Sequence, residues 1–141
     1  DLHSFPTRRS SDLAIKSSAV IIKAYRIQDK ARNVGFDWQK KEDVWVKVLE
    51  ELDELEEELK REDKEASTNE LGDFLFSVIN AARLYKLNPD NALERTNAKF
   101  TRRFNYIEQH SIKAGRPLTE MSLEEMDRLW NEAKTQEKET D

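Results

Sequence analysis

The sequence predicts an all-α fold, and three observations support this. The 141 residues include only three glycines and three prolines, too few for the many turns of an all-β fold. Apolar residues recur at intervals of three and four along most of the chain, as on one face of a helix. Hydrophobic residues make up only 37% of the chain and charged ones 38%. A monomer would have a thin core, so we expect a helical bundle that is completed by dimerisation.

The N-terminal part of the chain is expected to contribute little to the bundle. Residues 1–13 show no helical periodicity and lack the apolar stretch of a signal peptide, so we interpret them as an extraneous, poorly ordered segment. A first helix is predicted from Ala14 to about Asn33, and Gly35 is placed to end it. With the GFDW turn at Gly35–Trp38, this helix makes up a linker over residues 14–38.

Residues 39–134 are predicted to form the main domain. Its first helix, about Lys41–Arg61, is followed by a polar break and a second helix, about Thr68–Tyr85. The latter is the most apolar segment of the chain, and apolar residues cover much of its circumference, so we expect it to be central. The apolar seam predicted for the helix at 41–61 consists of Trp45, Val48, Leu52, Leu55 and Leu59.

Capping residues predict the bounds of the last two helices. Asn88 and Pro89 suit the cap and the first position of a helix that continues to about Lys113, where Gly115 ends it. Ser122 and Glu125 have the spacing of a capping box at the start of the final helix. Residues 135–141 are expected to fray as a tail.

Composition excludes several classes of function. A net charge of −5 argues against nucleic-acid binding, which needs a surplus of basic residues on one face. The chain has no cysteine, so it has neither disulfides nor thiolate metal sites. No apolar stretch approaches the roughly 20 residues that span a bilayer. We therefore expect a soluble cytoplasmic protein that binds no membrane.

An acidic run lies on the helix at 41–61. Seven of the nine residues 50–58 are acidic, and such a run taken alone is usually a solvated face. At about 100° per residue, however, Glu51, Glu54 and Glu58 share one flank of the apolar seam. This flank is therefore a candidate to enter a site at the edge of the bundle.

Asp73 stands inside the apolar segment LGDFLFSVI. Burying an unpaired carboxylate there would cost several kcal/mol unless a cation or hydrogen bonds compensated it. Glu70, Asp73, Ser77 and Asn80 fall on one stripe of this helix. The alternative is a structural acid paired with an arginine of the next helix.

Two acids three residues apart on each of two neighbouring helices can present four carboxylates to one point. Oxygen-only ligation selects magnesium, manganese or calcium, and magnesium commonly completes its shell with water and substrate phosphates. Lys99 and Arg103 border an apolar seam and could reach phosphate oxygens, although such residues commonly lay their stems on apolar surface. Asn97 and Trp130 could contact a base or ribose, but they are equally ordinary as a helix-edge amide and a core aromatic.

The ordered motifs resemble the MazG-like all-α nucleoside triphosphate pyrophosphatases. Glu50-Glu51-x-x-Glu54 followed by Glu70-x-x-Asp73 is similar to the EExxE and ExxD pattern of that family. Further similar segments are GFDW at 35–38, ELGDFLFSVINAAR at 70–83, NAKFTRRF at 97–104 and LWNEAK at 129–134. The resemblance is to the C-terminal MazG domain and covers about Ala14 to Lys134.

The resemblance implies an enzyme that hydrolyses (deoxy)nucleoside triphosphates to the monophosphate and pyrophosphate, as a homodimer or higher homo-oligomer. The implied magnesium ligands, for which Mn²⁺ is a substitute, are Glu51, Glu54, Glu70 and Asp73. Glu50 or Glu54 would be the base that accepts a proton from water. Lys99 and Arg103 would contact the triphosphate, and Asn97 and Trp130 would lie near the nucleoside. A lysine that some MazG proteins carry before ExxD has no equivalent here, because Ala66 occupies that position.

The alternative function is a non-catalytic acidic helical module, whose acid run is solvated and whose seams pair with partner helices. It predicts no dependence on a metal. A di-iron bundle needs Glu-x-x-His ligands, which the two histidines do not provide, and a P-loop motif does not occur.

Overall fold

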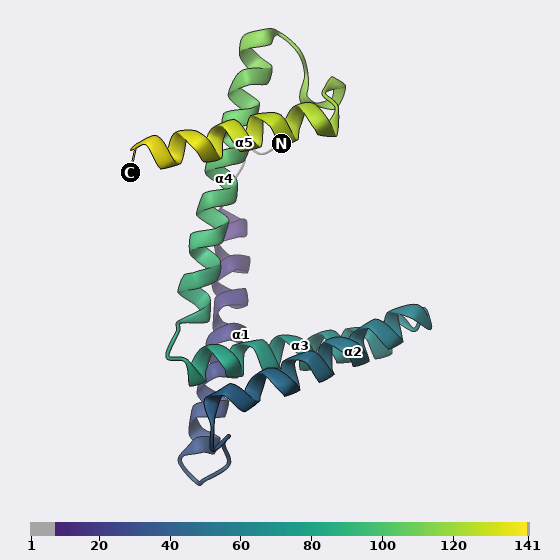
Figure 1. The fold of residues 1–141 in the computed structure, drawn as a ribbon, viewed down its shortest axis with the longest axis vertical. Helices are drawn as coiled ribbons and strands as arrows, with labels where there is room; N and C mark the ends of the chain where they lie inside the picture. The colour runs from purple at the N-terminus through teal and green to yellow at the C-terminus, as the bar shows by residue number, and fades with distance from the viewer. Residues whose placement is uncertain (1–7, 141) are drawn as a thin grey trace. The chain divides into compact units, whose positions relative to one another are not determined.

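The computed structural model describes residues 8–140, and these residues form helices and no strand (Figure 1). The all-α prediction is therefore confirmed. The helices are α1 (Arg8–Arg32), α2 (Val44–Lys60), α3 (Lys64–Leu84), α4 (Pro89–Ala114) and α5 (Leu123–Thr140), with short 3₁₀ turns at Lys41–Asp43 and Leu118–Glu120. The chain divides into two compact units, residues 1–92 and 93–141. No helix in the described part is both long and apolar enough to cross a membrane.

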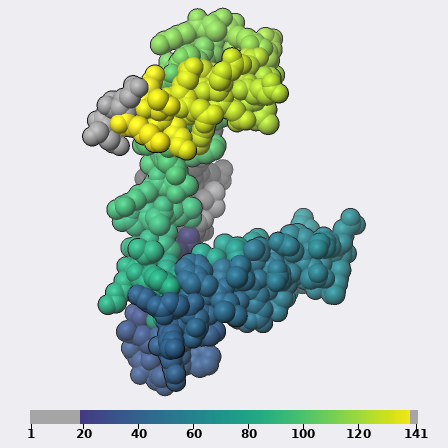
Figure 2. All heavy atoms as spheres, in the orientation of Figure 1, coloured from purple at the N-terminus to yellow at the C-terminus, as the bar shows by residue number. Residues whose placement is uncertain are grey.

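Helices α2 and α3 form an antiparallel hairpin, whose side chains lie in contact along the face seen in Figure 2. The turn between them is tight: Glu62 adopts a positive φ of 58°, and the Asp63 side chain caps α3 by accepting a hydrogen bond from the Ala66 N–H. Val44, Val48 and Ala81 form the buried core of the hairpin, with Phe74, Leu84 and Tyr85 packed against it.

The buried seam between these helices differs from the predicted one. On α2 the buried positions are Val44, Val48, Glu51 and Leu55, so Val48 and Leu55 were predicted correctly. Trp45 and Leu59 are exposed instead. The reason is that α2 meets α3 along a stripe one position away from the predicted apolar face, and this stripe includes Glu51. On α3 the buried positions include Ser67 and Ser77, so the seam is unusually polar.

The expectation that the helix at 68–85 is central is not met within this chain. Helix α3 packs against α1 and α2, but its stripe of Leu71, Leu75 and Val78 is exposed. Only two helices cover α3 in the first unit, and they cannot enclose an apolar surface that extends around most of its circumference.

Helix α1 is held on α3 by polar contacts. Gln28 is buried, and its Nε2 donates hydrogen bonds to the Ala24 carbonyl and, at 3.4 Å, to the Phe76 carbonyl. After α1 the chain turns at Gly35, whose φ of +90° favours glycine. The helix begins at Arg8, six residues before the predicted start, because no glycine or proline interrupts 8–13. The rest of the segment predicted at 1–13, residues 1–7, lies outside the described part.

In the second unit, α5 crosses α4 (Figure 1). The predicted helix ends are confirmed: the Asn88 side chain accepts from the Asn91 N–H, Gly115 has a φ of +63°, and Ser122 Oγ accepts from the Glu125 N–H. The structure has α5 continue to Thr140, and the fraying expected for 135–141 stays a prediction. Its last turns are fastened by Glu137, which pairs with Arg102 and Arg103 of α4 at 2.9 Å each.

This pairing predicts a loss of stability in acid. Hydrogen bonds from Arg103 and then Arg102 lower the pKa of Glu137 from its ordinary 4.5 to about 2. A depressed carboxyl pKa stabilises the fold fully above the unfolded value, and this stabilisation is lost as the pH falls from 4.5 toward 2. Glu137→Gln should therefore flatten the pH dependence of Tm over that window, measured by circular dichroism. Glu124→Gln, at an exposed position of the same helix, is the control, and an unchanged pH profile in Glu137→Gln would contradict the pairing.

Candidate metal centre

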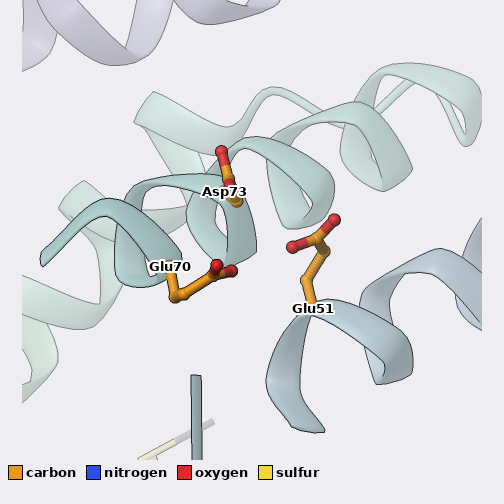
Figure 3. A group of neighbouring side chains, drawn as sticks. All are labelled: Glu51, Glu70 and Asp73. Atoms are coloured by element: carbon orange, nitrogen blue, oxygen red, sulfur yellow. The ribbon is translucent and has the colours of Figure 1, made fainter. Parts of the chain in front are cut away.

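Three carboxylates from the two facing helices converge in the hairpin. Glu51 of α2 and Glu70 and Asp73 of α3 each offer an oxygen, and these oxygens lie within 4.8 Å of one another (Figure 3). The convergence follows from local structure. Glu70 and Asp73 are three residues apart, so they lie on neighbouring positions of one helical face, and Glu51 occupies a buried seam position of the opposite helix.

The burial of this group is costly without a cation. Glu51 is only 6% exposed, and within the described residues Glu51 Oε2 and Glu70 Oε2 are buried and have no hydrogen-bond partner. Like charges this close repel, and desolvated carboxylate oxygens lose several kcal/mol unless they are compensated. Oxygen donors at this spacing suit a hard divalent cation such as magnesium. The residues present therefore fit the metal that the sequence motifs imply.

Asp73 and Glu54 correct two details of the sequence prediction. Asp73 lies in the cluster as predicted, but its side chain is exposed and not buried in an oily helix. Glu54 lies outside the group of three and is also exposed. Its pKa is nevertheless raised, first by the charge of Glu51 and then by desolvation and the charge of Glu70. Glu54 therefore lies within electrostatic reach of the cluster.

Lys47 is a site residue that the sequence interpretation missed. Its Nζ lies 2.8 Å from Glu51 and 3.9 Å from Glu50, and the hydrogen bond to Glu51 is the main cause of its raised pKa. Lys47 is thus the cation that partly balances the cluster, and it connects Glu50 to it. The signal was present in the sequence, because lysine and glutamate four residues apart on a helix face each other.

A cavity of about 720 Å³ adjoins the cluster within the first unit. Lys47, Glu51 and Asp73 line one part of it. The remaining lining comes from α1, the turn after it and α3, namely Ile27, Gln28, Ala31, Gly35, Phe36, Asp37, Trp38, Phe76, Ser77, Asn80 and Arg83. Its volume is in the range of pockets that bind small organic ligands.

The four predicted substrate contacts belong to the second unit. Asn97 and Lys99 are exposed on α4. Arg103 is partly buried, forms hydrogen bonds with Glu137 and lies 5.2 Å from the centre of the Trp130 ring. Trp130 also contacts Phe100, with ring centres 5.4 Å apart. The structure thus brings Arg103 and Trp130 together on α4 and α5, while Glu51, Glu70 and Asp73 converge in the first unit.

Comparison with known proteins identifies related sequences. Residues 39–107 match the family model of the MazG nucleotide pyrophosphohydrolase domain. The chain is 40% identical over 111 residues to the nucleoside triphosphate pyrophosphohydrolase/pyrophosphatase MazG of Thermotoga maritima. The aligned region covers 79% of this chain and 42% of that protein.

Two further relatives support the same relationship. The chain is 36% identical over 124 residues to the nucleoside triphosphate pyrophosphohydrolase of Escherichia coli K12. The aligned region covers 86% of this chain and 47% of that protein. It is 55% identical over 69 residues to the uncharacterized protein YabN of Bacillus subtilis. That aligned region covers 49% of this chain and 14% of YabN. The chain thus spans less than half the length of these relatives.

Proposed function

Residues 39–107 of this chain belong to the MazG nucleotide pyrophosphohydrolase domain family, and from that premise we propose that the chain hydrolyses nucleoside triphosphates to the monophosphate and pyrophosphate with magnesium. The observation that carries the proposal is the convergence of Glu51, Glu70 and Asp73, with buried oxygens that no residue of the described chain satisfies. The names of the relatives from Thermotoga maritima and Escherichia coli support the same activity.

Glu51, Glu70 and Asp73 would hold the magnesium ion, with Glu54 as the fourth ligand implied by the EExxE motif. When bound, magnesium or manganese would neutralise phosphate charge and acidify a coordinated water. Glu50 or Glu54 would accept the proton of the water that attacks the α-phosphorus, as the bond to the bridging oxygen of the β-phosphate breaks. The leaving pyrophosphate carries away that oxygen.

The basic residues would act on the triphosphate. Lys47 lies beside the acids and is suited to bind a phosphate oxygen when the metal relieves its pairing with Glu51. Lys99 and Arg103 would stabilise charge on the leaving pyrophosphate. Arg103 is paired with Glu137, so it would have to share or exchange that partner to bind phosphate. Asn97 and Trp130 are the nucleoside contacts that the family resemblance implies.

The activity is tested by separating the products. With a nucleoside triphosphate and magnesium, we expect monophosphate and pyrophosphate in equal amounts, and Glu54→Gln and Asp73→Asn should each lower the rate about 10²- to 10⁴-fold. Glu57→Gln, on the same acidic helix, is the matched control and should retain the rate. Diphosphate and orthophosphate as products would contradict the proposed bond cleavage. Full activity in both site variants would contradict the site.

We also propose that the chain forms a homodimer or higher homo-oligomer. Two apolar stripes remain exposed, Trp45, Val46 and Leu49 on α2 and Leu71, Leu75 and Val78 on α3. Contiguous exposed apolar surface of this kind is typical of an interface, and the thin core of the chain would gain from being covered.

Charged substitution should break the assembly. Leu75→Lys is expected to shift the protein toward the monomer in sedimentation-velocity experiments, because a lysine buried without a partner disfavours association. Val34→Lys, at an exposed position in the turn after α1, is the control and should leave the mass unchanged. A wild-type protein that sediments as a monomer at all concentrations would contradict the proposal.

A further inference from the structure

The cavity next to the acid cluster is lined by two chemically different groups of residues. Its lining includes Lys47, Glu51 and Asp73, which belong to or adjoin the acid cluster and suit a metal and phosphates. Ile27, Ala31, Phe36 and Trp38 give the lining an apolar and aromatic part. A nucleotide has the same division, because its charged phosphates and its flat aromatic base lie at opposite ends.

Hydrogen bonds hold the backbone of the turn that carries Phe36 and Trp38. The turn is anchored to α3 by Asp37, whose Oδ1 accepts a hydrogen bond from Arg83 Nη2 at 2.5 Å and another from the Trp38 N–H at 2.9 Å. The Phe36 N–H donates to the Ala31 carbonyl. Phe36 is nevertheless 81% exposed, and Trp38 is also exposed. Exposed aromatic rings on an anchored turn beside a cavity are suited to stack on a base.

Asn80 offers a fixed donor in the same cavity. Arg83 has only donors, so the Asn80 oxygen must face it, and Oδ1 accepts from Arg83 Nε at 3.0 Å. This orients the Nδ2 group away from Arg83, and within the described residues Nδ2 donates to no acceptor. Asn80 lies seven residues beyond Asp73 on α3, about 10 Å along the helix axis. A donor at that depth suits the O6 carbonyl of guanine or the O4 carbonyl of uracil and thymine, the position at which adenine and cytosine carry an amino group.

We propose that this cavity holds the nucleoside of the substrate, with Phe36 and Trp38 stacking on the base and Asn80 donating to a keto oxygen. The inference rests on the proposed function and deepens it by naming the preferred substrates as triphosphates of keto bases. It also moves the base contact from Trp130 to the turn after α1. Arg83 and Asp37 do not touch the base and act as positioning residues.

Stacking is tested by comparing nucleotides with a substrate that lacks a base. Trp38→Ala and Phe36→Ala should each raise KM for guanosine or uridine triphosphate about 10- to 100-fold with little change in kcat. Their kinetics with ribose 5-triphosphate should stay at wild-type values. Val34→Ala, in the same turn but not in the cavity lining, is the matched control. Trp38→Leu provides a second variant if the alanine variant unfolds, as judged by its Tm.

Base preference is tested by a nearly isosteric substitution. Asn80→Asp keeps the oxygen that accepts from Arg83 but replaces the Nδ2 donor with an acceptor. The ratio of kcat/KM for keto over amino bases should fall about 10-fold or more. Equilibrium dialysis with the corresponding monophosphates, in which no turnover occurs, should show the same shift in Kd.

The outcomes separate the two proposals. If wild-type protein hydrolyses no triphosphate, the proposed function fails. If it hydrolyses them but Phe36 and Trp38 variants affect ribose 5-triphosphate equally, the inference fails alone. A KM effect confined to Trp130→Leu would likewise overturn it and put the base in the second unit.

Discussion

Glu70→Gln is expected to abolish pyrophosphate release and, at the same time, to stabilise the metal-free protein. Among the described residues, Glu70 Oε2 is buried and has no hydrogen-bond partner, and an oxygen of Glu70 lies within 4.8 Å of carboxylate oxygens of Glu51 and Asp73. Removing one of three crowded negative charges should stabilise the hairpin by about 1–2 kcal/mol in the absence of metal. This corresponds to a rise in Tm on the order of 5 °C for a small domain.

The opposite signs of these two effects make the experiment decisive. Magnesium should raise the Tm of the wild-type protein, because an ion that binds only the folded state stabilises it by mass action. The Glu70→Gln variant should show little or no rise. Glu57→Gln is again the matched control and should behave as wild type in both assays. A lower Tm in metal-free Glu70→Gln together with an unchanged magnesium response would mean that Glu70 is a structural acid and not a ligand. A wild-type protein without any response would favour a non-catalytic helical module.

Asp37→Ala is expected to destabilise the first unit by about 3 kcal/mol. Its partner Arg83 has a side chain only 5% exposed, so the guanidinium would lose its closest charged contact in a site where water reaches it poorly. The hydrogen bond from Arg83 lowers the pKa of Asp37, so this stabilisation is present above the ordinary carboxyl pKa and is lost as the pH falls below it. Urea unfolding at neutral and acidic pH measures both effects.

A double-mutant cycle identifies the source of that loss. Asp37→Ala combined with Arg83→Met should recover part of the stability, because no buried charge is then left unpaired. Asp29→Ala is the matched control: this carboxylate also lies near Arg83, at 3.8 Å, but its side chain is 46% exposed. It should cost about 0.5 kcal/mol or less. Equal losses for Asp29→Ala and Asp37→Ala would show that Arg83 depends on general charge and not on its bond to Asp37.

The sequence predicted the helices well because their ends are marked by local chemistry. Asn88, Gly115 and Ser122 each act within one turn of their own position, and each predicted end is present. The proximity of Glu70 and Asp73 could also be predicted, because residues three apart are neighbours on any helix. These features depend on no contact with a distant part of the chain.

The remaining features depend on how the helices pack, which periodicity alone does not determine. The apolar pattern of α2 suits two adjacent faces, and the buried one proved to contain Val44 and Glu51 in place of Trp45 and Leu59. The cavity could not be predicted either, since it requires the turn at 35–38 to fold against α3. The long-range pair of Asp37 and Arg83, 46 positions apart, makes that contact.

The tight turn after α2 has a consequence for the order in which the protein acquires its structure. Glu51 and Glu70 are only 19 positions apart, and the helices that carry them adjoin in the chain, so their approach closes a short loop. Short loops cost little entropy to close, and contacts between near neighbours form fast. The carboxylate group can therefore assemble early, and its mutual repulsion would then oppose further compaction of the hairpin until a cation arrives. The concentration of the divalent cation during synthesis would therefore influence how rapidly this chain folds.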